Sequence, residues 1–108
     1  MNWYVFQVFN SDREHVYDLR ISQGGKEFKI KQVTDFGWKK GTIKGFDFLH
    51  SDGTKLGTTD AFINQPQFLD TFVLTAGSGR KYNCVKYGDP VTGLESSHRV
   101  ASHSLIRL

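Results

Sequence analysis

Apolar and polar side chains alternate along several short stretches of the chain. From Tyr17 to Ile21 every second residue is apolar, and the residues between them are charged. The stretch Glu27–Lys31 repeats this alternation, with Phe28 and Ile30 between charged residues. A period of two is typical of a strand that packs one face on a core and turns the other to water. Strands are predicted at Trp3–Phe9, Glu14–Ile21, Glu27–Lys31, Thr42–His50, Thr71–Thr75, Tyr82–Tyr87 and His98–Leu108.

Glycine-containing turns separate these strands. Gly25, Gly53 and Gly79 each end a predicted hairpin turn, and they lie 28 and 26 residues apart. Such turns need a positive φ, which glycine adopts readily. Only Asp60–Asp70 is compatible with a helical turn, and Pro66 interrupts it. The sequence therefore predicts an all-β, antiparallel fold of about seven to nine short strands. It leaves a β-prism, a barrel or a sandwich open, together with a three-fold pseudo-repeat.

Length and composition predict a single folded β domain over residues 1–108. The chain is 38% hydrophobic and 14% aromatic, with a net charge of +3, so neither the low aromatic content nor the high charge of a disordered chain applies. The single cysteine, Cys84, excludes an internal disulfide, and its place in an alternating stretch predicts a small buried residue. A mild basic excess favours anionic partners.

The sequence shows neither a targeting signal nor a membrane-spanning segment. The segment that begins at Met1 lacks the basic start of a signal peptide, and no apolar run approaches the roughly 20 residues that a spanning helix needs. We therefore expect a soluble protein that is cytoplasmic or released without a signal peptide, with no membrane partner.

Cationic and aromatic residues are concentrated in the centre of the chain. Aromatic rings beside a cationic groove hold single-stranded nucleic acid by stacking, and an indole in a glycine-flanked loop can equally carry a sugar ring. The alternative is that the rings of Phe36 and Trp38 close one end of the core while the lysines form a solvated face. The residues concerned are Lys29, Lys31, Phe36, Trp38, Lys39, Lys40 and Lys44.

Part of the chain resembles a jacalin-type lectin unit. The match covers about residues 27–57 and rests on Phe28-Lys29-Ile30, Gly37-Trp38, Ile43-Lys44-Gly45-Phe46-Asp47-Phe48 and Ser51-Asp52-Gly53-Thr54. The resemblance implies a three-sheet β-prism that binds a monosaccharide through loop aspartates and backbone amides. Near the end of the chain, the candidates for the family's sugar-binding loop are Gly88-Asp89-Pro90-Val91 and Gly93-Leu94-Glu95.

Catalytic and metal-binding patterns are not found. The four histidines are scattered, and one cysteine cannot build a structural zinc site, so no metal or cofactor is expected. No nucleophile elbow or phosphate-binding loop occurs either. We therefore expect a protein that is not an enzyme.

Three hypotheses for function follow. The leading one is a non-catalytic, lectin-like module in which Trp38 stacks on a carbohydrate. Its ligand-binding residues would be Trp38, Lys39, Lys40, Asp52 and Asp89. The alternative is a domain that binds nucleic acid or another polyanion, with Lys29, Lys31 and Lys44 added to the Lys/Trp patch. The third is a structural subunit that pairs through strand edges, which leaves a homo-oligomer open.

Overall fold

A computed structural model describes residues 2–60 and 70–92 of the chain. These residues form nine strands, and no helix occurs among them. The strands are β1 (Asn2–Phe9), β2 (His15–Ser22), β3 (Glu27–Gln32), β4 (Lys39–Lys44), β5 (Asp47–His50), β6 (Lys55–Thr59), β7 (Thr71–Ala76), β8 (Lys81–Lys86) and β9 (Val91–Thr92).

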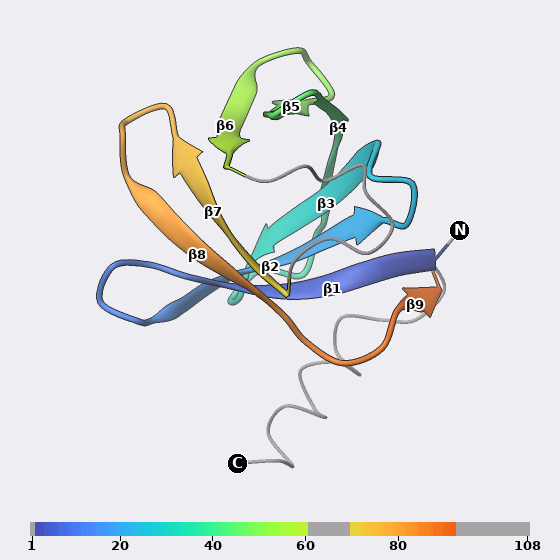
Figure 1. Ribbon diagram of the computed structural model, residues 1–108, viewed down its shortest axis with the longest axis horizontal. Helices are drawn as coiled ribbons and strands as arrows, with labels where there is room; N and C mark the ends of the chain where they lie inside the picture. The colour runs from blue at the N-terminus through green and yellow to red at the C-terminus, as the bar shows by residue number, and fades with distance from the viewer. Residues whose placement is uncertain (1, 61–69, 93–108) are drawn as a thin grey trace.

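Eight of the strands close into an antiparallel barrel. Strands β1 to β8 pair with their neighbours in sequence order, and β1 also pairs with β8, which closes the sheet (Figure 1). The short strand β9 adds to the other end of β1. Of the architectures that the sequence left open, the barrel is the one observed, and the predicted all-β, antiparallel class is confirmed.

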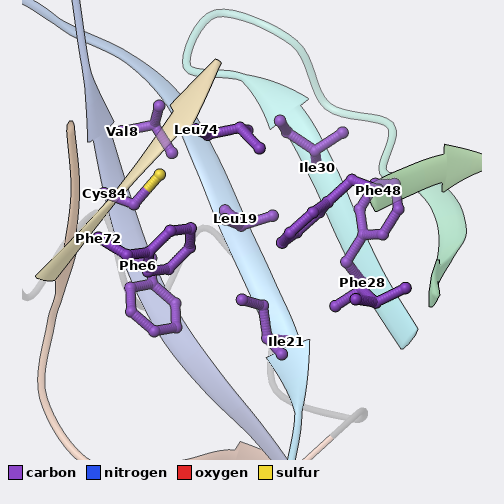
Figure 2. Close-up of a cluster of buried hydrophobic side chains, with 11 residues drawn as sticks. Phe6, Val8, Leu19, Ile21, Phe28, Ile30, Phe48, Phe72, Leu74 and Cys84 are labelled. Carbon is purple, nitrogen blue, oxygen red and sulfur yellow. The ribbon is translucent and has the colours of Figure 1, made fainter. Parts of the chain in front are cut away.

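Apolar side chains from alternate positions of each strand fill the interior of the barrel (Figure 2). Phe28 contacts Phe48 with ring centroids 5.1 Å apart, and Phe6 contacts Phe72 at the same separation. A barrel of eight strands is just wide enough for side chains to fill it. The buried cluster comprises Phe6, Val8, Leu19, Ile21, Phe28, Ile30, Ile43, Phe48, Phe72, Leu74 and Cys84. The predicted inward faces of residues 17–21 and 27–31 and the buried position of Cys84 are thus confirmed.

Alternation predicts that the outer face of β1, β2 and β3 is exposed to solvent, but several residues of this face are buried. Arg20 is 2% exposed and Lys31 is 7% exposed, although both point away from the core. Trp3 and Val5, on the outer face of β1, are buried as well. Period-two alternation tells which residues share a face, but it does not tell whether that face is covered.

All three predicted glycine turns are present. Gly25, Gly53 and Gly79 have φ values of 72°, 89° and 88°. In the β5–β6 and β7–β8 turns the same two backbone hydrogen bonds close the loop, as in a three-residue hairpin loop with a left-handed third residue. The β1–β2 turn has both bonds too, with Arg13 at φ 64° in the glycine position. The turn motif is therefore not restricted to three repeated units.

Three predicted elements need correction or lie outside the described residues. Thr42–His50 was predicted as one strand, but Gly45, with φ 60°, divides it into β4 and β5. The predicted strand at His98–Leu108 and nearly all of the segment Asp60–Asp70 lie outside the described residues.

Gly41 provides a test of the packing between β3, β4 and β5. A Cβ atom added there would lie 2.5 Å from the Phe28 ring and closer still to the Leu49 carbonyl oxygen. We expect Gly41→Ala to lower the free energy of unfolding by about 2–3 kcal/mol, measured by urea denaturation. Gly77→Ala is the matched control, because nothing lies within 4 Å of its added Cβ. Equal stabilities of the two variants would contradict this packing.

Candidate functional site: a cationic groove across strands β4 and β5

Strand β4 separates its side chains into two sets. Gly41 and Ile43 are buried towards the core, whereas Lys40, Thr42 and Lys44 are exposed on the outer face. Gly41 permits this arrangement because the Phe28 ring and the Leu49 carbonyl occupy the space that a side chain would need. The outer face of β4 therefore carries the two ammonium groups of Lys40 and Lys44, and Glu27 of β3 is paired in register with Thr42 between them.

Two depressions adjoin along this face of β4. One, of about 460 Å³, is lined at one end by Trp38 and Lys39, and the other, of about 420 Å³, is lined at its far end by Lys44. Their linings share Lys40, His50 and Ser51. We call this continuous surface the β4–β5 groove. Since β4 rises about 3.3 Å per residue, the groove extends about 16 Å from Lys39 to Lys44.

The β5–β6 turn forms one wall of the groove. Oδ1 of Asp52 accepts hydrogen bonds from the backbone N–H and the hydroxyl of Thr54, at 2.9 and 2.6 Å. These bonds lower the pKa of the Asp52 carboxyl below its ordinary value. Asp52 therefore lines the groove and at the same time stabilises the turn that carries it.

Trp38 lies at the end of the groove nearest the β3–β4 loop. It is half-buried, and its ring packs against two cations: the Arg20 guanidinium at 4.9 Å and the Lys31 ammonium at 5.5 Å from the ring centroid. The indole thus covers part of the buried outer face described above. It contributes to the groove with the part of its surface that stays exposed.

A row of three cations crosses the sheet beside the groove. Arg20 of β2 is paired in register with Lys29 of β3, which is paired in register with Lys40 of β4. Burial lowers the pKa of the Lys29 ammonium, and the positive charges of Lys40 and Arg20 lower it further, against the opposite effect of Glu27. Like charges on directly opposed residues repel, and a bound anion would relieve that repulsion.

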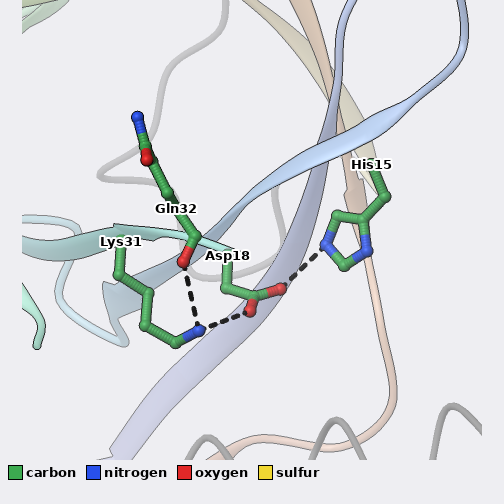
Figure 3. A network of polar contacts seen from close by, with 4 residues as sticks. All are labelled: His15, Asp18, Lys31 and Gln32. Carbon is green, nitrogen blue, oxygen red and sulfur yellow. Dashed lines mark hydrogen bonds and ion pairs between the residues drawn. The ribbon is translucent and has the colours of Figure 1, made fainter. Parts of the chain in front are cut away.

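Lys31 belongs to a separate ionic network (Figure 3). Its ammonium lies 3.1 Å from Oδ2 of Asp18, and His15 donates from Nε2 to Oδ1 of the same carboxylate at 2.8 Å. Burial raises the pKa of Asp18, but the hydrogen bonds from His15 and Lys31 outweigh it, so the net pKa is below the ordinary value. Lys31 is therefore held by this network, and it lines neither half of the groove.

The groove brings together four of the five residues predicted to bind a sugar. Trp38, Lys39, Lys40 and Asp52 line one depression, whereas Asp89 is exposed between β8 and β9 and lines neither half of the groove. The prediction missed Glu27 and Thr42, which line the other depression, and it missed three polar residues of the depression beside Trp38, namely His50, Ser51 and Thr54. Only the pairing of β4 with β5 and of β5 with β6 brings them beside Trp38, and alternation alone does not specify that pairing.

A second hollow, of about 400 Å³, lies beside His15. Tyr17 and Tyr82 contact each other edge-to-face in its lining, with ring centroids 5.8 Å apart, and Arg80 supplies a cation. It shares no lining residue with the β4–β5 groove.

Within residues 2–60 and 70–92, no group of three or more His, Cys, Asp and Glu residues is placed to hold a metal ion. That part of the chain also contains no helix long and apolar enough to cross a membrane.

The chain was also compared with known proteins. No protein-family model, no curated protein and no solved structure matches it. The jacalin-type resemblance therefore stays a prediction, and the geometry of the groove carries the functional inference.

The Asp18 network predicts a dependence of stability on pH. Because the pKa of Asp18 is lower in the folded chain than the value of about 3.9 in an unfolded one, its carboxylate stabilises the fold above that pH. This contribution is lost as the pH falls through the folded-state pKa. Between about pH 5 and about pH 2, denaturation midpoints should therefore fall more steeply for the wild type than for Asp18→Asn.

At pH 7, Asp18→Asn should lower the free energy of unfolding by about 2–3 kcal/mol, because it leaves the buried Lys31 ammonium without its carboxylate. The double variant Asp18→Asn, Lys31→Met removes both charges and should recover most of that loss. Parallel pH profiles for wild type and Asp18→Asn would contradict this account of the network.

Proposed function

We propose that this protein binds a linear polyanion in the β4–β5 groove. The observation that carries the proposal is the set of three exposed lysines that line the two adjoining depressions, over about 16 Å of strand β4. Lys40 and Lys44 lie on the outer face of β4 and Lys39 lies at its start, and they outnumber the two carboxylates of the lining, Glu27 and Asp52. The repulsion between Lys29 and Lys40 supports it, since negative charges beside the exposed Lys40 would offset that repulsion. Arg20, which Trp38 covers, lies outside the reach of such a ligand.

The same geometry favours an anionic chain over a neutral sugar. Trp38, the predicted stacking platform, already packs against Arg20 and Lys31. The Asp52 carboxylate, the predicted partner of sugar hydroxyls, accepts two hydrogen bonds from Thr54. Both side chains therefore have structural roles, while the three lysines of the groove remain exposed.

Carbohydrate binding, with the jacalin-type resemblance behind it, is the second candidate. It is favoured by one depression in which an indole, a carboxylate and the hydroxyl groups of Ser51 and Thr54 line the same space. Such a mixture of an apolar ring with polar groups suits a pyranose. The third hypothesis, assembly through strand edges, has less support, because each of strands β1 to β8 pairs on both sides within the barrel.

Charge reversal in the groove tests the polyanion proposal. We expect Lys40→Glu to weaken binding of fluorescein-labelled heparin and of a labelled oligonucleotide roughly tenfold in about 50 mM salt, measured by fluorescence anisotropy. Lys81→Glu is the matched control, because it changes the net charge equally but lies on β8, on the opposite side of the barrel. It should leave affinity nearly unchanged.

Salt dependence separates the two candidates. Polyanion affinity should fall steeply with salt, and Lys40→Glu should reduce that slope by about one. A neutral monosaccharide, titrated against tryptophan fluorescence, should respond little to the same salt series. If neither heparin nor oligonucleotide binds in low salt while a sugar quenches the fluorescence, the polyanion proposal is wrong.

A further inference from the structure

Phe36 is an unusual residue on this surface. Its side chain is 97% exposed, compared with 43% for Phe46 and 40% for Val33, the other large hydrophobic residues that are exposed among those described. The sequence left open a role for it in closing the core, and the structure excludes that role. Burial of a phenylalanine ring is favourable, so a ring held in water is available to any partner that covers it.

The backbone of Phe36 lies near one end of the groove. It lies in the loop between β3 and β4, two residues before Trp38, so their Cα atoms are at most about 7 Å apart. The loop starts at an anchored point, because Val33 donates a backbone hydrogen bond to Val16 and Asp35 donates one to Gln32. The backbone that carries this exposed ring is therefore close to the end of the groove that Trp38 and Lys39 line, and the ring itself lines neither depression.

A ring followed by a line of ammonium groups matches one kind of polyanion. A single nucleic-acid strand offers a base face for stacking at each nucleotide and a phosphate at each step. A duplex keeps its bases stacked inside, and a sulfated polysaccharide has no aromatic group. At about 3.4 Å per nucleotide of a stacked strand, the groove covers on the order of five nucleotides.

We propose that the β4–β5 groove binds single-stranded nucleic acid and that Phe36 stacks on a base at the Trp38 end. This inference rests on the proposed polyanion-binding function and narrows it to one class of ligand. Lys39 and Lys40 contact phosphates near the Trp38 end of the strand, and Lys44 contacts a phosphate about four nucleotides further along. The exposed part of Trp38 borders the same end of the strand as Phe36.

The test compares Phe36→Ala with Phe46→Ala. Phe46 is the matched control, because it is also an exposed phenylalanine but lies in the β4–β5 turn, at the opposite end of β4. Anisotropy titrations use labelled eight-nucleotide oligothymidylate, the same sequence as a duplex, labelled heparin, and vesicles of phosphatidylserine and phosphatidylcholine. Phe36→Ala should weaken oligothymidylate binding about 5- to 100-fold and heparin binding less than about twofold.

Further readouts complete the expected pattern. Phe36→Trp should retain binding, Phe46→Ala should not change it, and affinity should stop rising beyond about five or six nucleotides. If heparin and oligothymidylate bind but Phe36→Ala weakens neither, or both equally, the inference is overturned and the polyanion proposal stands. If Phe36→Ala abolishes vesicle binding and leaves oligothymidylate binding unaffected, the inference of single-strand binding is overturned in favour of a membrane surface. Failure of every polyanion to bind overturns the proposed function itself.

Discussion

Closure of the sheet by β1 is the constraint on which the rest of the structure depends. Because β1 pairs with both β2 and β8, the strands enclose a narrow interior that side chains must fill completely. The phenylalanine rings of the core satisfy this requirement with few residues. Every residue of the opposite parity is then directed outward, so Arg20, Lys29 and Lys40 come to lie side by side on three neighbouring strands.

The outer face has two regions with different chemistry. Over β1 to β3 the cations are placed against aromatic rings and an acid: Lys29 lies 4.5 Å from the Trp3 ring centroid, Arg20 lies over Trp38, and Lys31 is paired with Asp18. Contacts of this kind offset part of the cost of removing a cation from water. Beyond Lys29 this cover ends, and the lysines of β4 are exposed. The groove therefore begins where the aromatic cover of the sheet stops.

Local sequence pattern was sufficient for the inner face and insufficient for the outer one. Alternation identified Leu19, Ile21, Phe28 and Ile30 as inward, because the period of a strand fixes parity. It could not show that Arg20 and Lys31 are covered, since Trp38 reaches them from a loop. A positive φ at Gly45 divided a predicted strand, and that φ depends on the turn adopted. The groove was predicted only in part, because His50 and Ser51 join Trp38 through strand pairing between distant segments.

The cations on β2, β3 and β4 break a local rule of sheet stability. Opposed residues of like charge weaken the pairing of strands, and exchange of Lys29 or Lys40 for a threonine would remove the repulsion without altering the core. Sequences break such rules mostly where the offending residues serve another purpose. A polyanion along β4 would convert the repulsion into attraction, whereas a neutral sugar would leave it in place. The electrostatic cost within the free protein is thus itself a reason to prefer an anionic ligand for the groove.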